Sequence, residues 1–534
     1  MIFKNKSIRS IMIVSLIMIS SMMMGCLDNS NQESASSSVQ ADATTDMQQA
    51  DQVLTVGAQK DFKSAIEGRT LIFETLIGVD KYGNPLPKLV ESWDLSDDGK
   101  IYTFHLRKDV VLHDGTSFDA KVAKFAIDMS MKGASYKDYV EIVKIVDDHT
   151  LSVIFNKYYD TFLLDLASEF KGKVVSPLAV EPEWDPNGKI VEYVGTGPFK
   201  LVDYKKDQEA VLVRNDDYWG TKPKLEKVIW KTVPDPYTQI IALKAGELDI
   251  IGVGEHHSSI PYIELEKLEE NPNIDVMIQS FGRYQVIEFN CQKEPFTDKK
   301  VRSAFNYGID RELMVRTVFA DVTEPSYVIT APWFKWGPDN IKNGYMYDPD
   351  KAKQLLAESG WEDNDGDGIR EKNGEPFVCE LIVPFGEANA DVVSVFLQAE
   401  LKKLGIKMDI LTLESGAAGD KKTAGEYDMY VHHSSCLPSS GDVAPGGKYY
   451  SKYTTWEYAY HSDELDELIE TAYSTPDDVR QREALDQAWL LLQDEAPCIP
   501  LYDIVKPVAF RNKVHGFTFP ATMFETNLQE IEIR

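Results

Sequence analysis

The chain has 534 residues, of which 43% are hydrophobic, and its formal net charge is −30. This length predicts about three structural units, and the hydrophobic content is enough to form buried cores. The negative charge argues against binding to nucleic acid, whose phosphates need Lys and Arg, and against lying flat on an anionic lipid surface. We therefore expect a solvated acidic surface.

The N-terminus is typical of an exported protein. Two lysines and an arginine lie within the first nine residues, and an uncharged run follows over residues 10–24. The run is short for a membrane span and fits a signal peptide. The sequence Met-Met-Gly-Cys that ends at Cys26 resembles a lipobox, in which the cysteine becomes the lipidated first residue. We therefore expect a lipoprotein signal peptide over residues 1–26; an uncleaved N-terminal anchor is the alternative.

The next segment, residues 27–52, is rich in Ser, Gln, Asn, Ala and Asp and has no apolar periodicity. Such a composition cannot bury enough apolar surface to fold. We expect a flexible tether there and a folded body from residue 53 onwards.

The first part of the body predicts strands, turns and a helix. Residues 53–57 fit a strand, and the apolar run 71–77 fits a buried helix. Residues 101–107 alternate polar and apolar, as a half-buried strand does. His105 lies in this strand and His113 in a later turn, so we expect structural roles for both rather than metal binding.

The stretch 194–251 predicts a scaffold of strands around one helix and has no pattern of a catalytic motif. In order, it predicts a tight corner at Gly195, Gly197 and Pro198, strands at 199–202 and 227–231, a helix that begins at Asp235-Pro236 and ends at Gly246, and a strand at 248–251.

The remaining sequence alternates strands with capped helices. Thr297 or Asp298 can cap one helix, and Asp348 followed by Pro349 begins another. The further predicted elements are strands at 284–290, 377–383, 407–410 and 427–431, and helices at 392–404 and 479–492.

The chain contains, in this order, G-T-G-P-F, R-N-x-x-Y-W-G-x-K-P and P-D-P-x-x-x-x-x-x-L-x-x-G-E-L-D. Together they resemble the extracytoplasmic solute-binding proteins of peptide and nickel ABC importers, solute-binding family 5. The closing F-T-F-P-A-T-M-F-E-T-N-L-Q-E-I is similar to the nickel-binding branch. The resemblance implies an α/β fold with two lobes, the class II periplasmic-binding-protein-like fold, and a small extra subdomain in the first lobe. It places the first lobe at 53–284, the second at 285–504 and a return to the first at 505–534.

The resemblance also implies capture of a solute between the lobes and delivery to an ABC permease with its ATPase subunits, without catalysis. A ligand that touches both lobes adds contacts only in the closed form, so it shifts the population there. The expected cargo is nickel or a nickel chelate, and an oligopeptide or dipeptide is the alternative. We expect a monomer that is lipid-anchored at the outer face of the membrane and requires no cofactor.

A secreted hydrolase is a different class of function for an exported chain. Neither G-x-S-x-G nor H-E-x-x-H occurs in the sequence, which argues against it.

Two histidine pairs are candidate metal ligands, because each pair follows a predicted strand. They are His432 with His433 and His256 with His257. In open α/β sheets ligands gather beyond the carboxyl ends of strands, and imidazole suits Ni(II). Successive strand residues face opposite sides, so we expect at most one of His432 and His433 to point into the cleft. Ordinary polar loop residues are the alternative for both pairs.

The resemblance adds further candidates for ligand binding. Tyr158 begins a tract that runs toward the ligand cleft in this family, and Lys173 follows it, with Arg69 as a third candidate. The nickel-binding branch has an arginine after this tract that helps to hold an anionic metallophore. Lysine is a point charge and cannot supply the bidentate fork of that arginine. Asp442 is the acid that could pair with the amino terminus of a peptide, as in the family's peptide binders.

Asp363, Asp365 and Asp367 match the first half of a calcium loop, with a glycine at the sixth position. The bidentate glutamate expected at the twelfth position is replaced by Gly374, and Glu375 comes one residue late. A turn rich in Asp and Gly is therefore the alternative to a structural calcium ion. The body also contains Cys291, Cys379, Cys436 and Cys498, whose pairing the sequence leaves open.

Overall fold

The described part of the chain covers most of the predicted folded body. The structure is a computed structural model, and it describes residues 51–132, 135–170, 172–254, 260–338, 341, 344–387, 389–434, 446–452 and 458–534. Residues Ala50–Arg534 form one unit and Met1–Gln49 another. The predicted signal peptide, Cys26 and nearly all of the tether lie outside the described residues, so these assignments stay predictions.

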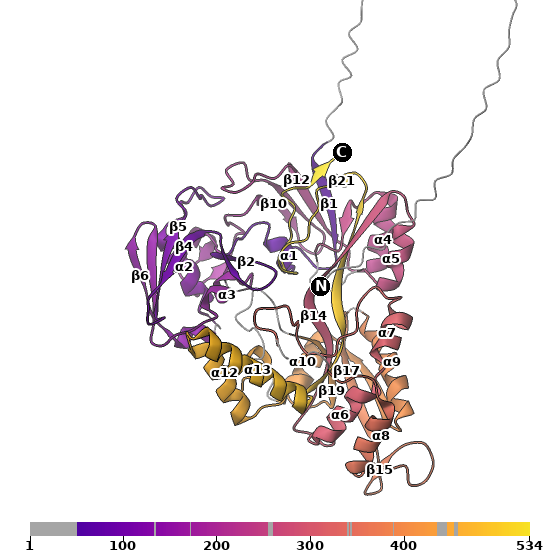
Figure 1. Cartoon of the computed structure of the whole chain (residues 1–534). Helices are drawn as coiled ribbons and strands as arrows, with labels where there is room; N and C mark the ends of the chain where they lie inside the picture. Colours follow the sequence, from indigo (N-terminus) through magenta and orange to yellow (C-terminus); the bar gives the residue numbers. More distant parts are fainter. Residues whose placement is uncertain are drawn as a thin grey trace, which may run out of the picture. The chain divides into compact units, whose positions relative to one another are not determined.

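A mixed sheet of ten strands runs through the body (Figure 1). Its strands, in spatial order, are β10 (Phe199–Lys205), β11 (Glu209–Arg214), β12 (Lys227–Thr232), β1 (Val53–Ala58), β13 (Ile250–Ile251), β20 (Cys498–Arg511), β14 (Ile274–Phe289), β19 (Met429–His433), β17 (Val378–Pro384) and β18 (Lys407–Leu413). We call the part that contains β10 to β13 lobe one and the part that contains β17 to β19 lobe two. Strands β14 and β20 belong to both lobes.

The connection between β12 and β13 shows how local sequence builds lobe one. Asp235 accepts a hydrogen bond from the Thr238 amide and caps α4 (Pro236–Ala245), and Pro236 occupies the first turn. Gly246 ends the helix with a φ of 82°, which favours glycine. The chain then returns to the sheet, where β1 lies parallel to both β12 and β13. The predicted strands and helix of this stretch are confirmed.

The pairing of β14 with β20 is interrupted where the two lobes meet. Residues Ile274 to Ser280 pair with the second half of β20, and pairing resumes at Tyr284 opposite Asp503. Gly282 lies within the interruption and has a φ of 73°. The predicted lobe boundaries at 284/285 and 504/505 lie next to this break and stay predictions.

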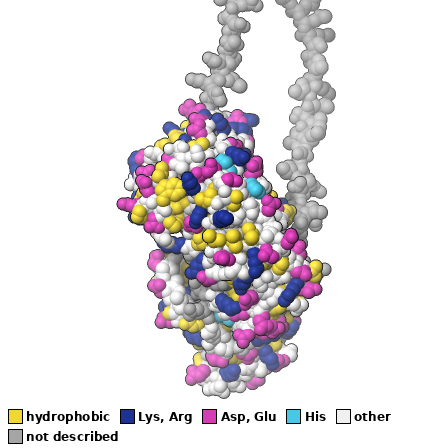
Figure 2. All heavy atoms as spheres, turned by 90° about the vertical axis from the view of Figure 1, so that its left-hand side faces the viewer, with side chains coloured by type: hydrophobic (Ala, Val, Ile, Leu, Met, Phe, Trp, Pro, Cys, Tyr) yellow, Lys and Arg dark blue, Asp and Glu magenta, His cyan; other side chains and the backbone are white. Residues whose placement is uncertain are grey.

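A four-stranded antiparallel sheet forms a subdomain of lobe one. Its order is β4 (Val90–Leu95), β5 (Ile101–Leu106), β7 (Thr150–Phe155) and β6 (Val140–Asp147). Strand β5 buries Tyr102, Phe104 and Leu106 and leaves the residues between them more exposed, as its alternation predicts. Strand β6 lies at the left of Figure 1, and this side of the molecule shows hydrophobic side chains among mixed acidic and basic ones (Figure 2).

Helices cover the sheet in both lobes. The α-helices besides α4 are α1 (Ile66–Arg69), α2 (Ala120–Ser130), α3 (Phe162–Ala167), α5 (Leu265–Glu269), α6 (Lys299–Gly308), α7 (Arg311–Val318), α8 (Pro349–Glu358), α9 (Ala390–Lys403), α10 (Ser415–Thr423), α11 (Gly446–Tyr449), α12 (Asp463–Ser474) and α13 (Asp478–Glu495). The predicted caps Asp298 of α6 and Asp348 of α8 are confirmed. None of the described helices has the length and apolar character needed to cross a bilayer. Short two-stranded ribbons complete the fold: β2 (Ile77–Val79) with β3 (Pro85–Pro87), β8 (Val180–Glu181) with β9 (Lys189–Ile190), β15 (Glu371–Lys372) with β16 (Glu375–Pro376), and β21 (Val514–His515) with β22 (Glu532–Ile533).

The predicted helix over residues 71–77 is wrong. Helix α1 ends before this run, and residues 71–76 are buried but not helical. Their backbone groups bond to other segments, since Gly197 N–H donates to Ile72 O at 2.8 Å and Val174 N–H donates to Glu74 O at 2.7 Å. A short apolar run fits a buried helix and a buried extended segment equally well.

The predicted corner at Gly195 and Gly197 explains how this segment is held. A Cβ atom at Gly195 would lie 2.3 Å from Ile72 O, and one at Gly197 would lie 2.6 Å from Leu71 O. Glycine is therefore needed at both positions because the two backbones touch. The corner fixes the segment that follows α1, whose Phe73, Glu74 and Thr75 line a cavity of lobe one.

Candidate functional site

Strand β19 brings His432 and His433 next to the interruption between the lobes. They lie opposite Val286 and Gln285 of β14, and both are half-buried. Their ring centroids are 4.3 Å apart, with an interplanar angle of 31°. The two rings therefore lie side by side, which differs from the expectation that alternation would separate them. The two rings are in contact although both residues pair with β14 in the ladder.

The surroundings of His432 carry positive charge. Burial lowers the pKa of His432 well below its usual value. Three cations lower it further, namely Lys448, Lys422 and Arg283. His432 is therefore a neutral imidazole at physiological pH, which is the form that ligates metals. The same cations disfavour a bare divalent cation and favour an anionic group.

Two of these cations belong to lobe two. Lys448 is 3% exposed, and its ammonium donates to the carboxylate of Glu288, which is 1% exposed. It also donates to the backbone oxygen of His433 at 3.3 Å. Burial and the nearby Lys448 lower the pKa of Lys422 to about 8. The surroundings of His432 in lobe two therefore contain one ion pair, Lys448 with Glu288, and one further lysine, Lys422.

Arg69 and Lys173 lie close to each other in lobe one. Arg69 ends α1, and Lys173 bridges to Thr75 through the backbone. Burial, together with the Arg69 guanidinium, lowers the pKa of Lys173 to about 8. The side chain of Arg69 forms no hydrogen bond with a described residue. Two neighbouring cations of this kind attract an anionic ligand.

Tyr158 lies in the subdomain, where it has a local partner. Its hydroxyl donates to Asp160 at 2.5 Å, and its ring packs against Gly99 in the turn between β4 and β5. Burial, and then the Asp160 carboxylate, raise the pKa of this phenol. A ligand contact at Tyr158 stays a prediction. His256, His257 and Asp442 lie outside the described residues, and their roles also stay predictions.

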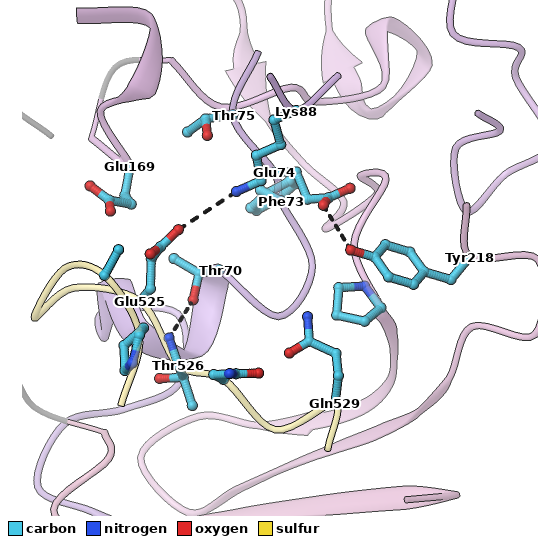
Figure 3. Close-up of a pocket in the computed structure, with 14 residues that line it drawn as sticks. Thr70, Phe73, Glu74, Thr75, Lys88, Glu169, Tyr218, Glu525, Thr526 and Gln529 are labelled. Atoms are coloured by element: carbon cyan, nitrogen blue, oxygen red, sulfur yellow. Dashed lines mark hydrogen bonds and ion pairs between the residues drawn. The ribbon is translucent and has the colours of Figure 1, made fainter. Parts of the chain in front are cut away.

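A polar cavity of about 260 Å³ lies within lobe one (Figure 3). Lys88 points toward Glu525, 3.6 Å away, and Glu74 accepts a hydrogen bond from the Tyr218 hydroxyl at 2.9 Å. Burial raises the pKa of Glu74. Burial opposes the charge on Lys88, but Glu525, Glu74 and Glu169 outweigh it and raise the pKa of Lys88. Three carboxylates thus act on one ammonium, and none of the predicted ligand-binding residues lines this cavity.

The predicted calcium loop brings Asp363, Asp365 and Asp367 together with Glu371. One ligating oxygen from each lies within 4.8 Å of the others. Glu371 occupies the ninth position of the loop. The calcium-loop pattern asks for a glutamate at the twelfth position, so the sequence alone did not single out Glu371. Asp363 also accepts hydrogen bonds from two glycine amides of the loop, as a turn rich in Asp and Gly does. Calcium at this loop stays a prediction.

One residue of this region was missed by the sequence analysis. Arg283 lies in the interruption of β14, directly after Gly282. The available signal was a glycine inside an alternating strand, which marks a bulge or a close approach. It gives no information about the side chain that follows.

The family model for bacterial extracellular solute-binding proteins, family 5 Middle, matches residues 84–456. The chain belongs to this family. A nickel-binding periplasmic protein of Escherichia coli strain K12 is 26% identical over 478 residues, which cover 87% of this chain and 90% of that protein. A dipeptide-binding protein of the same strain is 27% identical over 474 residues, which cover 81% of this chain and 83% of that protein.

A solved structure of another protein has the same fold. NikA from Brucella suis, in complex with Fe(III)-EDTA, superimposes with a TM-score of 0.79 at 24% identity. The match covers 90% of this chain and 100% of the NikA chain. The fold of this family 5 protein is therefore the two-lobed α/β fold of the class II solute-binding proteins. The predicted family and fold class are confirmed.

Proposed function

We propose that this family 5 solute-binding protein is the cargo-binding component of an ABC importer. It captures a nickel chelate between its two lobes and presents the closed form to a membrane permease and its ATPase subunits. The observation that carries the proposal is the side-by-side pair His432 and His433 in positively charged surroundings. The nickel-binding relative, which matches over most of both chains, supports the choice of metal.

The geometry favours a chelate over the bare ion. Two imidazoles supply at most two ligand atoms if each ring binds through one nitrogen, and Ni(II) prefers four or six. In the described part of the chain, His432 and His433 belong to no group of three or more clustered metal-binding side chains. A small chelator would supply the remaining ligands, and its negative charge would suit Lys422, Lys448 and Arg283.

An oligopeptide or dipeptide is the alternative cargo. The dipeptide-binding relative matches this chain nearly as well, and a peptide's carboxylate would suit the same cations. Its amino terminus would need an acid, for which Asp442 is the candidate. In either case we propose that the body works outside the membrane as a monomer held by a lipid on Cys26.

Calorimetric titration of the full chain separates the two cargoes. We expect Ni(II) with L-histidine to bind more tightly than Ni(II) alone or a pool of dipeptides. The double variant His432→Ala/His433→Ala should lose most of this affinity, by about 100-fold or more, because both imidazole ligands are gone. The matched variant His105→Ala/His515→Ala removes two exposed histidines elsewhere and should bind as the wild type does. Full nickel affinity in the first variant would remove these histidines from the site, and tighter peptide binding would favour the alternative.

A further inference from the structure

Strand β14 carries a buried arginine at the place where the two lobes meet. Arg283 lies between Ser280 and Tyr284, where the ladder with β20 is interrupted, so its backbone is not held by that ladder. Its side chain is nevertheless 4% exposed. Figure 1 shows β14 passing from one lobe into the other.

The guanidinium of Arg283 has few contacts for a buried charge. One terminal nitrogen donates to Met523 Sδ at 3.6 Å, and Cζ lies 6.0 Å from the ring centroid of Phe524. Nε is buried and has no hydrogen-bond partner among the residues that the structure describes. Glu67 of lobe one and Glu387 of lobe two act on it only through their charge, without a hydrogen bond.

The other two arginines that are buried in the described residues show what a satisfied guanidinium looks like in this fold. Arg302, 2% exposed, donates to the Glu495 carboxylate and to three backbone oxygens. Arg311, 1% exposed, donates to the Asn306 side chain and to four backbone oxygens. Against these two, Arg283 has a single weak sulfur acceptor. A buried charge without oxygen acceptors destabilises the folded state, so its presence requires an explanation.

We infer that Arg283 receives a carboxylate of the cargo at the hinge between the lobes. The inference rests on the proposed function and adds a specificity-determining residue to it. A guanidinium presents a planar fork that matches a carboxylate through two parallel hydrogen bonds. Arg283 precedes Tyr284, whose amide donates to Ser434 Oγ at 2.9 Å, next to His433, so one ligand could meet both the fork and the imidazoles. The carboxylate comes either from a metal chelator or from the C-terminus of a peptide.

Matched ligands that differ only in the carboxylate test this inference. The first pair is Ni(II) with L-histidine against Ni(II) with histamine, and the second is a dipeptide against its C-terminal amide. We expect the wild type to prefer the carboxylate-bearing member of one pair by about 10- to 100-fold, and that pair identifies the source of the carboxylate. Arg283→Met should abolish the preference, and Arg283→Lys should retain part of it. An undiminished preference in Arg283→Met would overturn the inference.

Stability of the ligand-free protein provides a second measurement that does not need a cargo. Arg283→Met removes an unsatisfied charge, so its melting temperature should equal or exceed that of the wild type. Arg311→Met is the matched control, and it should melt at a clearly lower temperature because five hydrogen bonds are lost. If Arg283→Met and Glu387→Gln each melt at a lower temperature than the wild type, and the double variant melts no lower than either, Glu387 is an internal partner of Arg283. The inference is then wrong. If no probe binds the wild type, the proposed function fails and the inference fails with it; if a probe binds but Arg283→Met keeps the full carboxylate preference, only the inference fails.

Discussion

His113 illustrates how a histidine in this chain serves the structure rather than the ligand. Its Nε2 lies 2.9 Å from Gly197 O, and its Nδ1 accepts from the Gly195 amide at 3.5 Å. One ring nitrogen therefore donates and the other accepts, which is possible only for the neutral ring. Burial lowers the pKa of His113 to about 4, and Lys200 contributes in the same direction. The ring thus fixes the glycine corner in its neutral form.

This geometry predicts a loss of stability in mild acid. Between pH 6.5 and about 4 the unfolded His113 takes up a proton and the folded one does not, so the free energy of unfolding falls as the pH falls. The full effect is up to about 3 kcal/mol. Urea unfolding at pH 8, 6.5, 5 and 4 should show that His113→Gln is less stable than the wild type at pH 8 and approaches it toward pH 4. Parallel curves would contradict the assignment.

At the scale of an element, β14 depends on one glycine. Gly282 has a φ of 73°, and a Cβ atom there would lie 2.6 Å from the Trp333 ring and 2.8 Å from Ala331 Cβ. Gly282→Ala should lower the free energy of unfolding by about 2 kcal/mol or more, from backbone strain and overpacking together. Gly419 in α10 is the matched control, because a Cβ atom there meets nothing within 4 Å. Gly419→Ala should stabilise the protein by about 0.5–1 kcal/mol, as alanine does within a helix. Equal effects of the two substitutions in urea unfolding would show that the hinge glycine is not constrained.

The elements that the sequence predicts well are those with end signals of their own. Helix α4 has Asp235, Pro236 and Gly246 at its ends, and each was found in its expected role. The run 71–77 has no such signals, and its conformation is decided by the corner at Gly195, which lies far away in the sequence. Long-range contacts of this kind leave no mark in a short apolar run.

In the candidate site, too, the sequence predicts what local patterns determine and does not predict what long-range contacts determine. His432 was predicted because it follows the apolar run of a predicted strand, and the family resemblance pointed to Arg69 and Lys173; the ligand-binding roles of all three stay predictions. The contact between the His432 and His433 rings was not expected, because alternation along a strand predicts that successive side chains point to opposite faces. Arg283 could not be predicted, because only the folded structure shows that its buried guanidinium has no oxygen acceptor among the described residues.

At the scale of the whole molecule, the two lobes touch at more places than the hinge strands. The subdomain of lobe one meets α12 of lobe two, where the Asp160 amide donates to Tyr473 O at 3.2 Å and Lys157 lies 3.4 Å from Glu470. Exposed ion pairs of this kind contribute at most about 1 kcal/mol each. Buried residues of the subdomain and of α12 also belong to one hydrophobic cluster, so the balance between open and closed forms depends on this contact as well as on the differential affinity of the cargo.

Labels on the two lobes can measure this closure directly. Val202 of β10 and Val395 of α9 are 58% and 60% exposed, which makes Val202→Cys and Val395→Cys suitable for a donor and an acceptor dye. Burial raises the pKa of the native thiols Cys291, Cys379 and Cys498, so these thiols react slowly with maleimides. The other two cysteines, Cys26 and Cys436, are replaced by serine in the labelled protein. Energy transfer should change when Ni(II) with L-histidine is added and not with L-histidine alone.

A pair of labels within one lobe distinguishes closure from quenching by the metal. Val202→Cys with Ile241→Cys places both dyes on lobe one, and its energy transfer should stay constant on the same addition. In the pair that spans the lobes, Arg283→Met should weaken the response, because the carboxylate is then held by fewer groups at the hinge. An unchanged signal from that pair, under conditions where calorimetry shows the cargo bound, would mean that this protein binds its cargo without moving its lobes.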